Sequence, residues 1–126
     1  MRLLIDSHVA LWWIEDNPYL GATARGHITA ADEVVFSAVT PWELGITRAL
    51  GKLTMPDGLA DALVAGGFRA LDISAHHAET AAALPAHHGD PFDRMLIAQA
   101  QLESLRLVTA DRAFDAYDVD LMDALA

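Results

Sequence analysis

The sequence predicts an α/β fold of three layers, α/β/α, in which a central, mainly parallel twisted sheet of four to five strands is covered by helices on both faces. Short runs of β-branched and other apolar residues alternate with longer segments of helical character along the whole chain. Strands and helices that alternate at this spacing imply a parallel sheet with both faces covered. A length of 126 residues suits one core, so we expect a single domain over residues 1–126.

The first third of the chain contains two strands, each followed by a helix. Apolar residues 3–5 predict a short buried strand, and the apolar segment 8–14 predicts a helix directly after it. Residues 18–31 are rich in alanine and predict a second helix. The β-branched run 33–39 predicts the second strand, and another helix is expected after it.

Two helix starts share one pattern: a capping side chain, a proline at the first helical position and an acid at the third. The pattern occurs in Thr40-Pro41-Trp42-Glu43, which resembles a capping box and predicts a helix that ends near Gly51. It occurs again in Asp90-Pro91-Phe92-Asp93, which opens the helix 94–102. That helix is apolar on nearly every side, so we expect it to be central.

The remaining elements continue the alternation. Before the central helix we expect a short helix at 58–66, a strand at 69–73, a helix at 75–84 that Ser74 caps, and a loop at 85–89. After the central helix we expect a strand at 107–109, a short helix at 111–117 and an edge strand at 119–121.

The composition excludes several classes of protein. No apolar run approaches the roughly 20 residues of a membrane-spanning helix. The apolar N-terminus reaches the acidic Asp6 too soon for a signal peptide. The lack of cysteine excludes disulfides, thiolate zinc sites and a cysteine nucleophile, and agrees with a reducing compartment. We therefore expect a cytoplasmic protein without membrane contact, whose metal ligands are oxygen or imidazole.

The net charge of −10 bears on the choice of partner. A polyanion is normally bound by a surplus of basic residues, so this charge argues against nucleic acid. The objection weakens if the acids gather in one metal-binding pocket and the few cations lie around its rim, where Arg48, Lys52, Arg94 and Arg112 could contact RNA. An acidic body also suits a basic protein partner.

Four acids are expected at one edge of the sheet. Asp6 ends the first strand, Glu43 lies one helical turn past the second, and Asp111 ends the fourth. Ligands of open parallel sheets bind beyond the carboxyl ends of the strands. Asp93 comes from the start of the central helix, and its place at this edge follows from that helix start.

Each acid has an ordinary structural explanation, because acids at helix starts satisfy free amides and complement the helix dipole. Capping does not explain a shared rim, nor like charges one turn apart at Asp90 and Asp93. A shared Mg²⁺ or Mn²⁺ would explain both features, since these ions prefer hard oxygen ligands. Such an ion activates water for in-line attack on phosphorus, and four carboxylates could hold one ion or two. The Ser7 and Thr109 hydroxyls could hydrogen-bond a metal-bound water or fix a carboxylate.

Other chemistry-bearing residues fit known sites less well. The pairs His76-His77 and His87-His88 lack the spacing of zinc hydrolases, so we interpret them as surface imidazoles, and His8 could simply pack. Three tryptophans, at positions 12, 13 and 42, could stack on bases but are more typical of a core or a dimer contact. Neither a serine-nucleophile elbow nor a phosphate-binding glycine-rich loop is present.

Four segments, in this order and at these separations, resemble PIN-domain ribonucleases, specifically VapC-type toxins of type II toxin–antitoxin (VapBC) pairs. They are Leu4-Ile5-Asp6-Ser7-His8, Pro41-Trp42-Glu43, the segment from Asp90 to Ala98, and Val108-Thr109-Ala110-Asp111. The resemblance covers essentially the whole chain. It implies an endoribonuclease dependent on Mg²⁺ or Mn²⁺ that hydrolyses RNA phosphodiester bonds with metal-activated water.

The resemblance also implies roles and partners. Asp6 and Asp93 would be the direct metal ligands, Glu43 and Asp111 would complete the pocket, and Asp90 would be an accessory acid. A cognate VapB-like antitoxin would hold a homodimer, insert a segment into the active site and carry the DNA-binding part, so this chain would meet DNA only indirectly.

Two alternatives remain open on the residues. A Mg²⁺-dependent phosphatase or phosphotransfer domain would need an Asp-x-Asp pair or a late lysine, whereas this chain has Asp6-Ser7-His8 and its only lysine is Lys52. A catalytically silent module could keep the fold and bind RNA or an antitoxin, although the intact acids count against it. The sequence does not choose among transfer, ribosomal and messenger RNA.

Overall fold

The five strands form one parallel sheet in the order β3-β2-β1-β4-β5, which confirms the predicted fold class. The computed structural model describes residues 1–126. The strands are β1 (Arg2–Ile5), β2 (Glu33–Ser37), β3 (Arg69–Leu71), β4 (Arg106–Thr109) and β5 (Leu121–Asp123). Strand β1 is therefore central, with β2 and β4 on either side.

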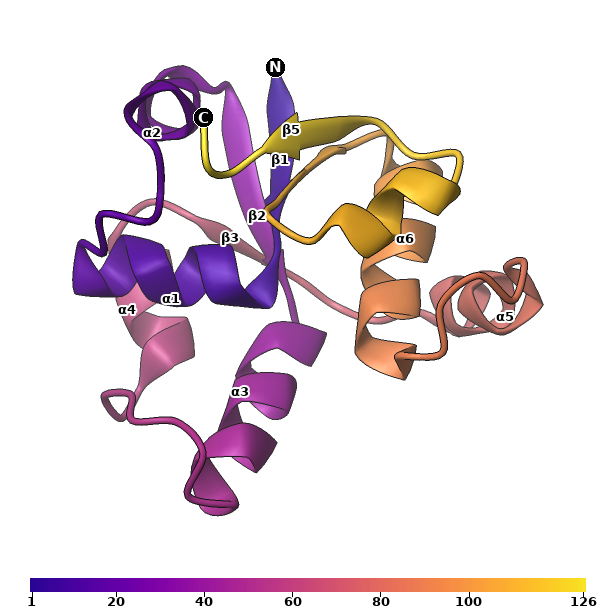
Figure 1. Ribbon diagram of the computed structural model, residues 1–126, viewed down its shortest axis with the longest axis horizontal. Coiled ribbons are helices and arrows are strands. Elements are labelled where there is room, and N and C mark those ends of the chain that lie inside the picture. Colours follow the sequence, from indigo (N-terminus) through magenta and orange to yellow (C-terminus); the bar gives the residue numbers. More distant parts are fainter.

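Helices cover both faces of the sheet (Figure 1). Six are α-helical and one short helix, η1, is of the 3₁₀ type. Their bounds are α1 (Ser7–Glu15), α2 (Ala22–Ala30), α3 (Val39–Ala49), α4 (Leu59–Ala65), α5 (Ala75–Ala83), α6 (Pro91–Glu103) and η1 (Arg112–Ala116). No helix is long and apolar enough to cross a membrane.

The central strand contributes to a hydrophobic core on each face. Leu3 and Ile5 pack with residues of α1, α2 and α4, whereas Leu4 packs with residues of α6 and η1. All three side chains are inaccessible to solvent. This follows from the two-residue period of a strand, and it explains why β1 is an unbroken apolar run.

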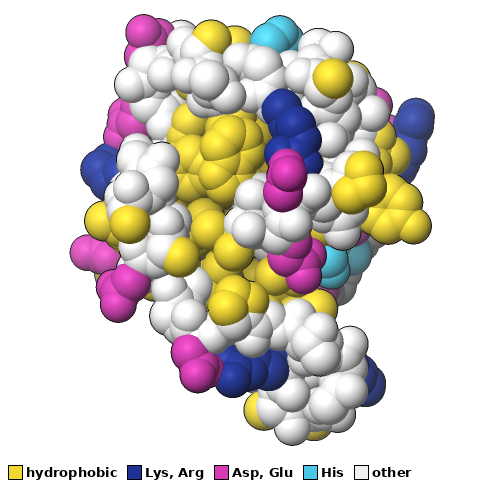
Figure 2. Space-filling model, turned by 90° about the vertical axis from the view of Figure 1, so that its left-hand side faces the viewer, with side chains coloured by type: hydrophobic (Ala, Val, Ile, Leu, Met, Phe, Trp, Pro, Cys, Tyr) yellow, Lys and Arg dark blue, Asp and Glu magenta, His cyan; other side chains and the backbone are white.

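On the face of α1, α2 and α4, hydrophobic side chains gather in a hollow (Figure 2). Trp13, Ile28 and Phe68 are among its lining residues, and the rings of Trp13 and Phe68 lie 5.4 Å apart.

The step from β2 to α3 differs from the prediction. Strand β2 ends at Ser37, and α3 begins at Val39, whose N–H donates to the Ser37 hydroxyl at 3.1 Å. The predicted strand to residue 39 and the predicted capping box at Thr40 are therefore wrong. Thr40 lies inside the helix and is buried, because the serine turns the chain earlier than the β-branched run indicates.

Smaller differences also have local causes. The second helix begins at Ala22 rather than at residue 18, since the Asn17 side chain accepts a hydrogen bond from Tyr19 N–H and shapes a turn. The edge strand is residues 121–123 rather than 119–121, because Val119 N–H donates a hydrogen bond to the Tyr117 carbonyl and the chain forms a turn there. The predicted cap at Ser74 is confirmed.

Candidate metal centre

The candidate site lies at the carboxyl edge of the sheet, as the topology predicts. Asp6 directly follows β1, and Thr109 is the last residue of β4. Glu43 comes from α3 and Asp93 from α6, while Asp111 stands at the start of η1. Residues from five separate elements therefore meet beyond the strand ends.

Asp6 forms the buried wall of the site. Its side-chain Oδ2 accepts a 2.5 Å hydrogen bond from the Thr109 hydroxyl, and Oδ1 accepts a long one, 3.4 Å, from His8 N–H. Burial raises the pKa of Asp6 despite the Thr109 hydrogen bond. Of the two roles expected for the Thr109 hydroxyl, the structure has the one in which it fixes a carboxylate.

Glu43 does not cap its helix. It lies in the second turn of α3, and its Oε1 accepts a hydrogen bond from Ser7 Oγ at 2.7 Å. Ser7 Oγ lies 3.1 Å from the hydroxyl of Thr40. Burial is the main cause that raises the pKa of Glu43, and the charges of Asp6 and Asp90 add to it. The structural explanation offered for this acid, a capping box, therefore no longer applies.

Asp93 is also free of a capping duty, because Asp90 performs it. Asp90 Oδ1 accepts from Phe92 N–H at 2.8 Å and from Asp93 N–H at 3.2 Å. The Asp93 side chain is only 13% exposed. Burial raises its pKa to about 6, helped by the charges of Asp90, Asp6 and Glu43 and opposed by a hydrogen bond from His88.

Asp93 belongs to two groups of side chains that could hold a cation. In each group the ligand atoms lie within 4.8 Å of one another: one contains Glu43 and Asp90, and the other contains His88 and Asp111. Asp6 is in neither group, although its charge acts on Glu43 and Asp93. Four of the five predicted acids thus lie around shared positions, with Asp6 beside them.

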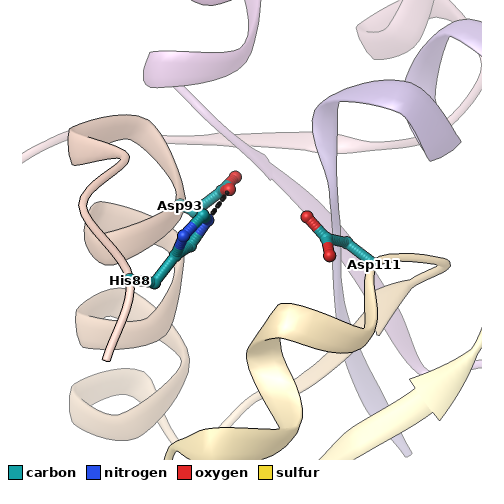
Figure 3. A group of neighbouring side chains, drawn as sticks. All are labelled: His88, Asp93 and Asp111. Atoms are coloured by element: carbon teal, nitrogen blue, oxygen red, sulfur yellow. Dashed lines mark hydrogen bonds and ion pairs between the residues drawn. The ribbon is translucent and has the colours of Figure 1, made fainter.

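The second group spans the gap between α6 and η1 (Figure 3). The carboxylates of Asp93 and Asp111 face one another there, and the His88 ring lies against Asp93, with Nε2 2.6 Å from Oδ2. This hydrogen bond is the main cause of the raised pKa of His88. Asp111 is exposed and caps η1 by accepting from Ala113 N–H at 2.9 Å, so its cap explanation holds.

Sequence reasoning missed His88 and Thr40. The one available signal for His88 was its loop position five residues before Asp93, at the entry to the helix that carries that acid. Thr40 was interpreted as a helix cap, and only the true start of α3 reveals its contact with Ser7. His77, of the other pair, is buried and completes the capping box of Ser74, so the interpretation as a surface imidazole is wrong for it.

The predicted basic rim is mostly occupied with other contacts. Arg94 donates to backbone carbonyls of the 82–88 segment, including Leu84 at 2.8 Å. Arg48 pairs with Asp57 at 2.6 Å, and Arg112 lies 3.4 Å from Asp115. Lys52 is exposed and forms no ion pair.

The tryptophans divide into two kinds. Trp12 and Trp13 are partly buried against the core, as expected. Trp42 is 61% exposed, so the core interpretation is wrong for it; its ring meets the ring of Phe92 edge-on, with 5.0 Å between centroids. An exposed indole therefore lies beside the helix that carries Asp93.

The donor set suits a divalent cation. Carboxylate oxygens dominate both groups, and no lysine or arginine forms an ion pair with any of the five acids. Hard cations such as Mg²⁺ and Mn²⁺ bind such oxygens, whereas thiophilic metals would find no cysteine thiolate. The acidic clusters are thus compatible with divalent-metal binding.

Comparison with known proteins agrees with this geometry. The sequence model of the PIN domain family matches residues 3–120. The chain is 36% identical to Ribonuclease VapC22 of Mycobacterium tuberculosis over 118 residues, 87% of each chain.

Solved structures share the fold at lower identity. They include VapBC2 from Rickettsia felis bound to a promoter DNA fragment, with a TM-score of 0.71, 15% identity and coverage of 97% of this chain and 98% of that one. DNA-bound VapBC from Salmonella typhimurium has a TM-score of 0.70, 19% identity and 98% coverage of both chains. The chain thus belongs to the PIN-domain family, as its four motifs predicted.

Proposed function

We propose that this chain is the toxin of a type II toxin–antitoxin pair and acts as an endoribonuclease dependent on Mg²⁺ or Mn²⁺. The observation that carries the proposal is the position of Asp93, whose carboxylate belongs to two candidate ligand groups at the carboxyl edge of the sheet. The curated relative is named a ribonuclease, and the structural neighbours are described as toxin–antitoxin complexes. RNA hydrolysis is the reaction that fits both the site and these relatives.

The residues divide the work. Asp93 is a proposed direct ligand, supported by Glu43 and Asp111, and Asp90 caps α6 beside them. Asp6 is the second proposed ligand; it lies outside both groups, but its charge acts on Asp93. A divalent cation held there would supply Lewis acidity, which lowers the pKa of water and offsets charge on the leaving oxygen.

The chain's own groups prepare this site before any ion binds. Ser7 and Thr109 each donate to one carboxylate, which fixes the orientation of Glu43 and Asp6. Burial raises the pKa values of Asp6, Glu43 and Asp93, and the charges of neighbouring acids add to the shift at Glu43 and Asp93, so an added positive charge is favoured there. Because RNA is a polyanion, the residues that bind it have to lie outside this acidic pocket.

The proposed partners are a VapB-like antitoxin and a second copy of this chain. The net charge of −10 suits a basic antitoxin. Trp42 and Ile46 of α3 and Leu50 at its C-cap are exposed at four-residue spacing, which gives an apolar stripe that begins with Trp42 beside α6. DNA would be contacted only through the antitoxin, since the chain has few free cations.

The test is metal-dependent RNA cleavage by protein freed of antitoxin. Wild type, Asp6→Asn and Asp93→Asn are incubated with structured RNA in EDTA, Mg²⁺ or Mn²⁺. Asp118→Asn is the matched control, because Asp118 is an exposed acid that forms no ion pair and lies outside the pocket. We expect cleavage by wild type and the control with metal only, and a loss of orders of magnitude in the two site variants.

Two results contradict the proposal. One is cleavage by Asp6→Asn and Asp93→Asn at the wild-type rate. The other is an absence of cleavage by wild type with any divalent metal, and RNA binding without turnover would then favour a catalytically silent module.

A further inference from the structure

We propose that His88 is a positioning residue for Asp93, and that Arg94 and Tyr117 hold it in place. The inference rests on the proposed function, because it assigns His88 a role through a proposed metal ligand. The evidence is a continuous set of contacts that runs from a buried tyrosine, through a loop backbone, to the carboxylate.

The first contact joins the ring to the acid. His88 Nε2 lies 2.6 Å from Asp93 Oδ2, and both side chains are mostly shielded, at 25% and 13% exposure. Asp93 faces the charges of Asp90, Asp6 and Glu43, which favour rotation of its carboxylate away from the pocket. A donor fixed against Oδ2 opposes that rotation and keeps the carboxylate turned toward the gap that Asp111 faces (Figure 3).

The second set of contacts fixes the backbone that carries the ring. His88 N–H donates to the Tyr117 hydroxyl at 2.8 Å, and the His88 carbonyl accepts from Arg94 Nη1 at 3.3 Å. Arg94 also donates to the carbonyls of Leu84 and Pro85, and the Tyr117 hydroxyl donates to Pro85 at 2.9 Å. The segment has no helix or strand, so these bonds replace secondary structure.

The arrangement links the loop to the ligand through one helix. Arg94 directly follows Asp93 in α6, so the helix that presents the acid also holds the loop that orients it. Tyr117 is buried at the C-terminal end of η1, and Asp111 caps the N-terminal end of the same helix. Partners of this kind orient ligating groups, and their removal typically costs about 10- to 100-fold in metal affinity or activity.

The experiment measures Mn²⁺ affinity of the untagged protein by titration, for wild type, His88→Ala and His88→Gln. His76→Ala is the matched control, since His76 is an exposed histidine of α5 with no side-chain hydrogen bond. We expect His88→Ala to weaken binding by about 10- to 100-fold without a change in fold. His88→Gln keeps a donor near the Nε2 position and should restore most of the affinity, which a merely structural role does not predict.

A double-mutant cycle tests the route through Tyr117. Tyr117→Phe removes the hydroxyl that holds the loop, so it should weaken Mn²⁺ binding. It should add little when His88 is already alanine, because contacts that act in series are not additive. Circular dichroism and thermal melts verify that each variant is folded.

Several outcomes overturn the inference. They are wild-type affinity in His88→Ala, full additivity of the two substitutions, or ¹⁴N modulation of an imidazole ligand in the electron spin echo of bound Mn²⁺, which would make His88 a direct ligand. Absence of Mn²⁺ and Mg²⁺ binding in wild type instead contradicts the proposed function itself.

Discussion

Replacing Asp93 with asparagine should stabilise the metal-free protein while it removes metal binding. Asp93 has an ordinary pKa of 3.8 and a pKa of about 6 in the folded protein, chiefly because it is buried. One pKa unit corresponds to about 1.4 kcal/mol, so ionising this carboxyl in the fold costs about 3 kcal/mol at most. Residual exposure of 13% and relaxation of the neighbours reduce this, and we expect a gain of about 1–3 kcal/mol at pH 8.

The effect has a defined dependence on pH. The folded pKa is raised, so the folded state binds the proton more tightly than the unfolded state does. The contribution of Asp93 to wild-type stability therefore falls as pH rises from about 4 through about 6, and its penalty is complete above that range. The pKa of His88 is raised from 6.5 chiefly by its hydrogen bond to Asp93, so the stability that His88 contributes is lost as pH rises above 6.5, and this extends the fall beyond the Asp93 range. The advantage of Asp93→Asn should be small at pH 4 and full at pH 8.

Urea unfolding in EDTA between pH 4 and 8 measures this difference, with Asp118→Asn as the control. For a chain of this length, each kcal/mol corresponds to roughly 3–6 °C in Tm. Mn²⁺ at about 1,000 times its Kd should reverse the order, because a ligand that binds only the folded wild type then stabilises it by about 4.1 kcal/mol, more than the expected gain of the variant. A variant less stable than wild type at pH 8 in EDTA, or a difference that does not vary with pH, would refute the reasoning.

Three further substitutions test other contacts. Ser7→Ala removes the 2.7 Å hydrogen bond to Glu43 and should lower cleavage and Mn²⁺ affinity by about 10-fold or more, whereas unchanged values would show that the hydroxyl is not needed. Gln99→Met should change the free energy of unfolding by less than about 1 kcal/mol, because it removes the buried, unpartnered Oε1 but also the 3.3 Å hydrogen bond from Nε2 to the Asp72 carbonyl; a loss above 1 kcal/mol in urea unfolding contradicts this. Gly21→Ala should lower the free energy of unfolding by about 1–3 kcal/mol, since a Cβ there would overlap the backbone of Ala126, and an unchanged Tm would show that the C-terminus yields freely.

The fold was largely predictable because its signals are local. Apolar runs and their spacing located all five strands, three of them, β2, β3 and β5, with ends shifted by two residues. The errors arose where a side chain competes with the regular pattern. Ser37 ends β2 by accepting the hydrogen bond of Val39 N–H, although the residues after it have high β propensity. The chain around Val119 stays in a turn, so β5 begins two residues later.

The site was predictable in its elements but not in its contacts. Strand topology placed Asp6, Glu43 and Asp111 at one edge, since the ends of parallel strands meet there. The cap of α6 by Asp90 also follows from its helix start, but the capping explanation offered for Asp93 is wrong, because Asp90 accepts the free N–H groups there. The position of His88 depends on how a loop without secondary structure folds over α6, and no periodicity encodes that.

The distribution of charge separates the acids that serve structure from those of the pocket. Glu33, at the amino end of β2, pairs with both Arg2 and Arg69, and its pKa is lowered by these partners. Glu43 and Asp93 have hydroxyl or imidazole partners instead, and their pKa values are raised. A structural carboxylate gains from a fixed cationic side chain, whereas a site that must admit a soluble cation loses affinity if one is built in. Repulsion among the pocket acids lowers the stability of the metal-free protein, and this is the condition under which a bound divalent ion is favoured.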